Sequence, residues 1–259
     1  MKVDFKTMLL SAQVANNSIL GIGLDTFSTN KKLIKDSATI ASVLKIDPAD
    51  YRSEGYAGIR ILLQNIEDAR NYAPTIPIIF DGKYAGSARA NESYAKEAFD
   101  FYKVDAVTVS PYGGMDTFEP FLERTDKGIF VVCKMSNNDS GEFQDQLVPM
   151  PGTIRRGELY QRVAYDVARH WNRHGNCGLV VGATYPNALR FVRDIVGDEM
   201  TILSPGAGKH QGGDIRKAVL AGKNSAGKGL ILHFSSQIED AKEPRDEARM
   251  LRDEINRYR

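Results

Sequence analysis

An acid and a lysine stand two positions apart at the end of an apolar stretch of β-forming residues. The stretch covers residues 77–81, and Asp81 and Lys83 mark its carboxyl end. Such a run, with Pro77 in front of it, is typical of a buried strand. Side chains two apart on an extended chain point the same way, so a carboxylate and an ammonium would lie side by side. Taken alone, the pair is better explained as an ordinary structural ion pair.

Composition excludes several kinds of partner. The chain has 259 residues, 42% hydrophobic and 26% charged, as in ordinary globular proteins. With 34 Lys and Arg against 33 Asp and Glu, its net charge of +1 gives no overall field to attract nucleic acid or an anionic membrane. No apolar run approaches the ~20 residues of a membrane span, and residues 1–6 lack a signal-peptide core. We expect a cytoplasmic protein.

The two cysteines, Cys133 and Cys177, lie far apart in the sequence and next to apolar residues. They form no C-x-x-C motif. This pattern predicts buried, reduced thiols and argues against a disulfide, a zinc site or a nucleophile.

Apolar strand-like stretches alternate with helix-compatible segments along the chain. The expected strands cover residues 20–25, 41–45, 77–81, 106–110, 128–134, 178–182, 201–204 and 229–235, and a charged helix over 238–258 closes the chain. Eight strand-then-helix units predict an α/β fold of the (β/α)8 TIM barrel type, with residues 1–259 as one domain. A doubly wound sheet is the alternative, but no G-x-G-x-x-G opens a helix after the first strand. A polar insertion around 137–157 is either a lid over the site or a solvated excursion.

In such barrels the chemistry gathers at the carboxyl ends of the strands. This rule selects Asp25, Lys45, Asp81, Lys83, Ser110 and Ser136. Two acids and two lysines would then meet on one rim as an alternating Lys–Asp–Lys array, in which each side chain is fixed by its neighbours.

A glycine-rich loop at residues 204–214 follows the seventh strand and opens toward a helix. Its glycines include Gly206, Gly208, Gly212 and Gly213. Glycines let backbone N–H groups approach phosphate oxygens, and a helix N-terminus adds partial positive charge. Barrels commonly bind phosphate at the loops after strands seven and eight. The loop therefore indicates a phosphorylated substrate.

Several motifs in one order resemble the orotidine 5′-phosphate decarboxylase family, in its longer bacterial-type branch. The resemblance covers residues 21–238. It rests on Gly21-Ile22-Gly23-Leu24-Asp25, Asp81-Gly82-Lys83 within the family's D-x-K-x-x-D, residues 105–112, Ser136-Asn137, Gly182-Ala183-Thr184-Tyr185-Pro186, Gln211-Gly212-Gly213-Asp214 and Ser235-Ser236-Gln237-Ile238. It implies a homodimer that converts orotidine monophosphate (OMP) to UMP and CO2 in pyrimidine biosynthesis, with no metal or organic cofactor.

The resemblance also implies a role for each matching residue. Asp25 and Lys45 would hold the ribose hydroxyls, and Asp81 would position Lys83, the proton donor to C6 of the pyrimidine. Ser136 would bind the base and recognise it. The phosphate would be bound by Gln211 and the backbone amides beside it, at Gly212 and Gly213, with Gln237 near them.

Two positions depart from the family pattern. The last acid of D-x-K-x-x-D, which in the family crosses into the partner's site, is replaced by Gly86, and a phosphate-binding Arg after the eighth strand is replaced by Gln237. Gln donates hydrogen bonds without a charge or a bidentate fork. Without the acid, Lys45 and Lys83 would leave a surplus positive charge that holds an anionic ligand and slows the loss of CO2.

Three explanations of Gly86 stay open: an engineered substitution that traps ligand, which we favour; a natural homologue with impaired activity; or a nearby acid such as Glu92 acting instead. Two other functions are also open. One is a catalytically weak nucleotide-binding homologue. The other is a metal-dependent phosphosugar lyase or synthase of the same superfamily, such as a hexulose-6-phosphate synthase.

Overall fold

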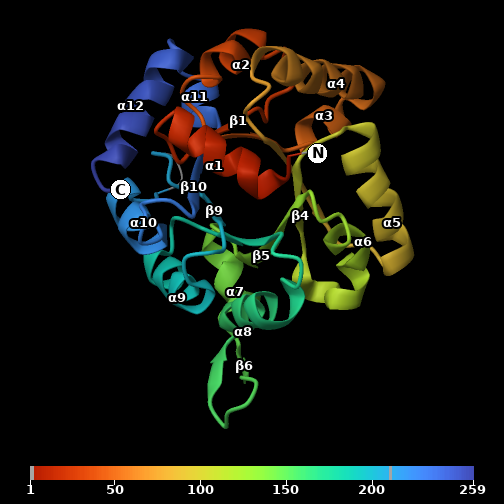
Figure 1. Cartoon of the computed structure of the whole chain (residues 1–259), viewed down its shortest axis with the longest axis vertical. Helices are drawn as coiled ribbons and strands as arrows, with labels where there is room; N and C mark the ends of the chain where they lie inside the picture. Colours follow the sequence, from red (N-terminus) through yellow and green to blue (C-terminus); the bar gives the residue numbers. More distant parts are fainter. Residues whose placement is uncertain (1–2, 210–211) are drawn as a thin grey trace.

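The computed structural model describes residues 3–209 and 212–259. Eight parallel strands close into a barrel, which confirms the predicted fold class (Figure 1). The barrel strands are β1 Leu20–Gly23, β2 Val43–Ile46, β3 Ile78–Tyr84, β4 Ala106–Val109, β5 Gly128–Lys134, β8 Cys177–Val181, β9 Ile202–Pro205 and β10 Leu230–Phe234. Each pairs with the next along the chain, and β10 returns to β1, where Leu232 aligns with Leu20.

Helices surround the barrel and cover its outer face (Figure 1). The α-helices of the structure are α1 Phe5–Ala15, α2 Lys31–Ser37, α3 Ala49–Ser53, α4 Gly55–Tyr72, α5 Ala88–Lys96, α6 Glu119–Leu122, α7 Gly141–Gln144, α8 Leu159–Asp166, α9 Pro186–Val196, α10 Ile215–Gly222, α11 Ser236–Glu239 and α12 Pro244–Asn256, with π-helical turns at Glu97–Phe101 and Val167–Trp171. The single closing helix expected over 238–258 is wrong. It is divided into α11 and α12, because Pro244 lacks the N–H that a helix interior needs but suits a first turn.

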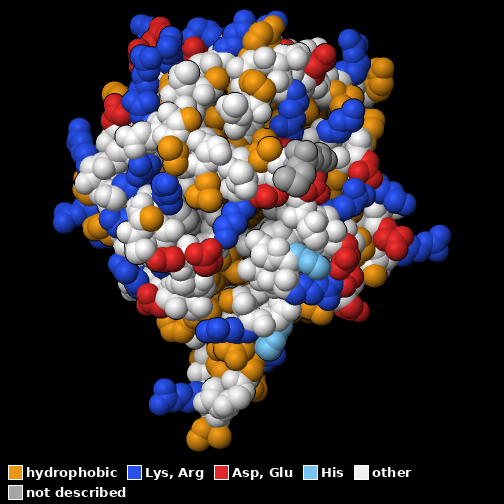
Figure 2. Space-filling model, viewed as in Figure 1, with side chains coloured by type: hydrophobic (Ala, Val, Ile, Leu, Met, Phe, Trp, Pro, Cys, Tyr) orange, Lys and Arg blue, Asp and Glu red, His pale blue; other side chains and the backbone are white. Residues whose placement is uncertain are grey.

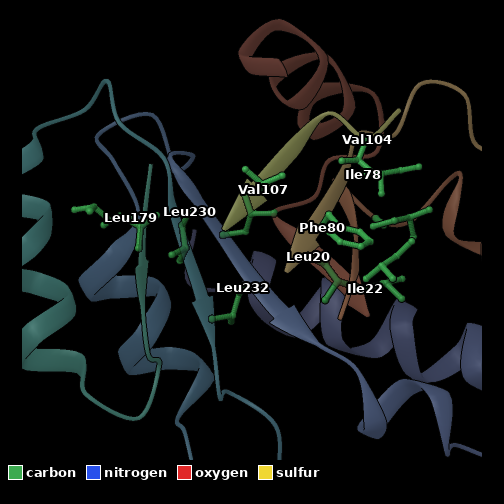
Figure 3. Packing of buried hydrophobic residues seen from close by; sticks show 14 of the residues in the cluster. Leu20, Ile22, Ile78, Phe80, Val104, Val107, Leu179, Leu230 and Leu232 are labelled. Atoms are coloured by element: carbon green, nitrogen blue, oxygen red, sulfur yellow. The ribbon is translucent and has the colours of Figure 1, made fainter. Parts of the chain in front are cut away.

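The strands separate two apolar cores because successive side chains point to opposite faces. Ile78 and Phe80 face the surrounding helices, together with Leu20, Ile22 and Val107 (Figure 3). Ile79 lies between Ile78 and Phe80 in the sequence and belongs to the cluster that fills the barrel. The members of this interior cluster are Phe5, Leu9, Val43, Ile79, Ala106, Phe130, Val132, Val180, Leu203 and Ile231.

Helix α1, which the sequence analysis did not foresee, lies across the amino-terminal mouth of the barrel (Figure 1). Asp4 begins the helix by accepting a hydrogen bond from the Thr7 amide at 2.8 Å. The Phe5 amide donates to the Asp126 carbonyl at 3.0 Å, just before β5 begins. The Phe5 ring meets Phe130 edge to face, with 5.6 Å between the ring centroids. The apolar side of α1 thus extends the barrel's interior core.

The insertion forms a β-hairpin that projects away from the barrel (Figures 1 and 2). Its strands are β6 Leu147–Pro149 and β7 Arg156–Glu158, paired antiparallel. Ile154, between the two strands, is fully exposed. The chain before the hairpin is anchored by the buried Lys134, whose Nζ lies 2.6 Å from Asp145 Oδ1.

Cys133 and Cys177 are free and buried, as predicted. Burial raises the pKa of both thiols, that of Cys177 to about 12. Within residues 3–209 and 212–259, no helix has the length and apolar character needed to cross a membrane.

Candidate active site

A cavity of about 210 Å³ opens at the carboxyl-terminal mouth of the barrel. Its floor is the last layer of the interior core, formed by Val132, Val180 and Leu203. Its walls are formed by Asp25, Lys45, Asp47, Asp81, Lys83, Met135, Ser136, Pro205, His233 and Ser235. The two acids and two lysines expected at the strand ends therefore meet around one space.

Lys45 is the buried centre of this charged group. Its side chain is only 5% exposed, and its Nζ lies 3.0 Å from Asp81 Oδ2 and 3.5 Å from Asp25 Oδ1. Burial disfavours the ammonium, but the carboxylates of Asp81, Asp25 and Asp47 outweigh that cost and raise the pKa of Lys45 above its ordinary value. Lys45 is therefore charged near neutral pH.

Asp81 joins the two lysines. Its Oδ2 lies 2.9 Å from Lys83 Nζ, and its Oδ1 accepts a 2.7 Å hydrogen bond from the Thr108 hydroxyl. Burial favours the neutral acid, but Lys45 and Lys83 together outweigh it and hold the pKa of the Asp81 carboxyl well below its usual range. Asp81 is thus an ionised acceptor that both ammonium groups share.

A local irregularity in β3 brings Lys83 into this position. The pairing of β3 with β4 shifts between Phe80 and Tyr84, and Lys83 adopts a left-handed backbone with φ of 44°. A left-handed residue that is not glycine is strained. The Lys83 amide donates to the Thr108 hydroxyl at 2.9 Å, which helps to hold the conformation. The expected Asp–Lys contact is therefore present, but it is made by a bulge, whereas we expected a regular extended strand.

Asp47 is a member of the cavity that the sequence analysis missed. Its Oδ2 lies 3.3 Å from Lys83 Nζ, and its amide donates to Asp25 Oδ1 at 2.9 Å. The expectation of a surplus positive charge is therefore wrong, because three carboxylates, those of Asp25, Asp47 and Asp81, contact the two ammonium groups. The signal was present in the sequence: Lys45-x-Asp47 repeats Asp81-x-Lys83 with the charges reversed.

His233 and Thr108 were missed as well. His233 follows the inward-facing Ile231 by two residues on β10 and is 5% exposed. Burial and then the Lys45 ammonium lower its pKa to about 3, so the imidazole beside the cavity is neutral. On β4 the inward residue is Thr108, which contacts Asp81, whereas Ser110, expected there, does not line the cavity.

Ser136 lines the cavity beyond β5, as expected. A Cβ at Gly182 would lie 2.7 Å from the Ser136 Cα, so the glycine permits close approach of the two segments. The Thr184 hydroxyl donates to the Ser136 carbonyl at 2.9 Å and fixes this turn. No residue of 137–157 lines the cavity, so the insertion is an excursion and not a lid in this conformation.

The glycine-rich loop follows β9, but its described residues beyond Pro205 do not line the cavity. Gly213 packs so closely on the Gly206 carbonyl that a Cβ would lie 2.2 Å from its oxygen. Gly212 has a left-handed backbone with φ of 79° and open space around it. Gln211 lies outside the described residues. The N-terminus of α10 is capped by Asp214, whose side chain accepts from the Lys217 amide at 2.9 Å, which leaves that terminus less suited to an anion than we expected.

Gln237 lies behind the same loop and does not line the cavity. Its Oε1 accepts from the Lys209 amide at 3.0 Å, and its Nε2 donates to Glu247 Oε1 at 2.6 Å. The side chain thus joins the glycine-rich loop to α12.

Comparison with known proteins identifies the family. The model of the orotidine 5′-phosphate decarboxylase / HUMPS family matches residues 17–251. The chain belongs to this family. It is 39% identical to an orotidine 5′-phosphate decarboxylase of Bordetella avium, over 99% of this chain and 100% of that protein. The resemblance noted over residues 21–238 is therefore confirmed.

Solved structures of the family have the same barrel. Leishmania donovani OMP decarboxylase superposes with a TM-score of 0.88 at 31% identity, over 99% of this chain and 98% of that one. Leishmania donovani UMP synthase superposes with a TM-score of 0.90 at 33% identity, over 98% of this chain. This chain spans only 56% of that longer protein.

Gly86 stands where the family motif D-x-K-x-x-D would end in an acid. It lies in the loop between β3 and α5 and does not line the cavity. Glu92, which we considered as a replacement, is an exposed residue of α5 and does not line the cavity either. Within this chain, the acids around the cavity are Asp25, Asp47 and Asp81.

Proposed function

We propose that this chain is an orotidine 5′-monophosphate decarboxylase, which converts OMP to UMP and CO2 in pyrimidine biosynthesis. The observation that carries the proposal is the alternating array in the cavity: Lys45 lies between Asp25 and Asp81, and Lys83 lies beside Asp81. It is found at the carboxyl-terminal mouth of a barrel whose relatives carry that name.

The reaction needs little more than fixed charges. When the bond between C6 of the pyrimidine and the carboxylate carbon breaks, CO2 departs and the electron pair stays on C6. Water stabilises this localised charge poorly, so an ammonium already held in place lowers the energy of the transition state more than that of the bound substrate. In the proposal Lys83 then donates a proton to C6, while Asp81 positions the two ammonium groups.

The other contacts follow the family pattern. Asp25 and Lys45 would bind the ribose hydroxyls and Ser136 the base. The phosphate would be held by Gln211 and the amides of Gly212 and Gly213, with Gln237 supporting the loop. Phosphate bound far from the reacting carbon contributes binding energy to loop closure and to the exclusion of water.

Formation of UMP from OMP by the unaltered chain tests the proposal, with Lys83→Met as the matched control. We expect turnover by the unaltered chain and its loss in the variant, while calorimetry still detects UMP binding. Binding of UMP by the unaltered chain without any turnover would contradict the proposal and favour a non-catalytic nucleotide-binding homologue.

Impaired activity caused by Gly86 stays a prediction, whether the glycine is engineered or natural. Comparing the unaltered chain with Gly86→Asp and Gly86→Ala tests it, because both variants add a Cβ and only one adds a carboxylate. A faster Gly86→Asp variant would confirm the impairment. Equal rates would show that position 86 needs no acid.

The homodimer, the single domain over residues 1–259 and the cytoplasmic location expected from the sequence also stay predictions. Light scattering on the purified protein tests the first of these. A molar mass of one chain at micromolar concentration would contradict it.

A further inference from the structure

The Lys83 ammonium lies between two carboxylates of its own chain. Its Nζ is 2.9 Å from Asp81 Oδ2 and 3.3 Å from Asp47 Oδ2. The side chain is 41% exposed, so without partners it would sample many rotamers in water. The two carboxylates together define where the ammonium points.

The neighbouring strands β2 and β3 carry their lysine and aspartate in opposite order. Lys45 precedes Asp47 at the end of β2, and Asp81 precedes Lys83 at the end of β3. Ile46 aligns with Phe80, so the residues that follow each leave the barrel side by side. Each lysine consequently contacts an acid from the other strand: Lys45 contacts Asp81, and Lys83 contacts Asp47.

Asp47 is fixed by its backbone surroundings. Its Oδ1 accepts a 3.0 Å hydrogen bond from the Ala49 amide, which leaves Oδ2 directed at Lys83. Its own amide donates to Asp25 Oδ1 at 2.9 Å. The contacts therefore form a closed circuit that runs through Asp25, Lys45, Asp81, Lys83 and Asp47.

We propose that Asp47 is a positioning residue, which holds the Lys83 ammonium toward the cavity and supplies from the same chain the acid that position 86 lacks. The inference rests on the proposed decarboxylase function and adds to it. An ammonium that is already oriented needs no reorganisation when negative charge develops on the reacting carbon. The carboxylate that the family motif places at position 86 is then supplied by Asp47, which follows β2.

The decisive variant is Asp47→Asn. Asparagine keeps the shape of the side chain and an oxygen for the Ala49 amide, but it loses the charge that faces Lys83. Asp50→Asn is the matched control, because Asp50 is an exposed acid on α3 that does not line the cavity. Asp47→Glu keeps the charge and displaces it by one methylene.

For Asp47→Asn we expect kcat for OMP to fall about 100-fold, the size of effect that misplacement of a catalytic group by ~1 Å can have. Its UMP affinity and melting temperature should stay close to those of Asp50→Asn. Asp47→Glu should recover part of kcat. We also expect the gain in turnover of Gly86→Asp over Gly86→Ala to stay below tenfold, because Asp47 already supplies an acid to Lys83.

Equal kcat for Asp47→Asn and the unaltered chain would overturn the inference, while UMP formation by the unaltered chain would still support the proposed function. A fall in kcat accompanied by an equal fall in UMP affinity or a lower melting temperature would show a structural role and overturn it too. A tenfold or greater gain in Gly86→Asp over Gly86→Ala would show that the array lacks its acid. No UMP from the unaltered chain would overturn the proposed function and this inference together.

Discussion

Asn91 holds Gly86 from both sides. Its Oδ1 accepts from the Gly86 amide at 3.1 Å, and its Nδ2 donates to the Gly86 carbonyl at 3.1 Å. The same Nδ2 donates to the Thr117 carbonyl at 2.6 Å, and the Asn91 side chain is fully buried. A Cβ on Gly86 would lie 2.8 Å from the Ala90 Cβ and 2.9 Å from Asn91 Oδ1. The loop is therefore fitted to a residue without a side chain.

Gly86→Ala should lower the free energy of unfolding by about 1–3 kcal/mol, because the added methyl overpacks this loop. Urea unfolding measures the change. Ala85→Ser, one atom larger at the exposed neighbouring position, is the control and should stay within about 0.5 kcal/mol of the unaltered chain. The same small change in Gly86→Ala would show that the loop has room for a Cβ.

Lys45→Met should both destabilise the protein and abolish turnover. Methionine fills a similar volume but leaves Asp25 and Asp81, whose side chains are 22% and 14% exposed, without the ammonium between them. Removing one partner of a buried ion pair costs about 3–5 kcal/mol. Lys32→Met provides the contrast, since Lys32 is 77% exposed in its pair with Asp36 and should contribute about 0–1 kcal/mol. Similar unfolding curves for the two variants would contradict this difference.

Thr108→Val should reduce kcat with little change in fold. The hydroxyl donates to Asp81 Oδ1 and accepts from the Lys83 amide. Its loss therefore removes one hydrogen bond from Asp81 and one from Lys83. Leaving a buried acceptor unsatisfied costs about 1–3 kcal/mol, which corresponds to roughly 5- to 150-fold in rate if the cost falls on the transition state. Thr108→Ser keeps the hydroxyl and should retain most activity; an equal loss in the serine variant would show that packing, and not the hydroxyl, matters.

The raised pKa of Glu239 predicts that the stability of the unaltered chain and of a Glu239 variant will differ in their dependence on pH. Burial and then the Asp25 carboxylate raise the pKa of Glu239 to about 7 from an ordinary 4.5. Between these values the folded chain holds a proton that the unfolded chain has lost, so the group's contribution to stability is full below pH 4.5 and is lost as pH rises through 7. Glu239→Gln mimics the neutral acid at every pH and keeps an oxygen for the amides of Asp25 and Thr26.

We therefore expect the Glu239→Gln variant to gain about 1–3 kcal/mol over the unaltered chain as pH rises from 5 to 8. Urea unfolding at the two pH values measures this gain. Glu67→Gln, at an exposed position of α4, is the control and should show no such trend. Parallel pH dependence of the Glu239 variant and the unaltered chain would contradict the raised pKa.

Turnover should persist after dialysis against EDTA. The carboxylates of Asp25, Asp47 and Asp81 already contact the ammonium groups of Lys45 and Lys83. Among residues 3–209 and 212–259, no three His, Cys, Asp or Glu side chains are grouped to hold a metal. Loss of activity that Mg²⁺ restores would instead favour the metal-dependent phosphosugar chemistry that the sequence left open.

The barrel was predictable because its parallel strands are buried on both faces and stand out as apolar runs. Helix α1 was not, since its contacts are with Phe130 and Gly128 at the far mouth of the barrel and leave little local signal. The break before Pro244 could have been predicted from the proline alone. The hairpin at 147–158 has strands of only three residues, and Pro149, Pro151 and Gly152 leave no clear alternation of period two.

The charged residues at the strand ends were predictable because inward and outward positions alternate from a recognisable apolar run. Asp47 was missed because the second strand was expected to end at Lys45, whereas β2 continues to Ile46 and Asp47 follows it directly. Ser110 was chosen because it ends the expected fourth strand, whereas β4 ends at Val109 and Thr108 is the residue that contacts Asp81, beside the bulge in β3. A sequence gives side-chain type and spacing, whereas a bulge depends on pairing with the neighbouring strand.

The position of α1 has a consequence for access to the cavity. Because Phe5 and Leu9 of this helix belong to the apolar cluster that fills the barrel interior, the cavity with the charged residues is reached from the carboxyl-terminal mouth. In the proposed reaction, OMP would enter and both UMP and CO2 would leave by this same mouth.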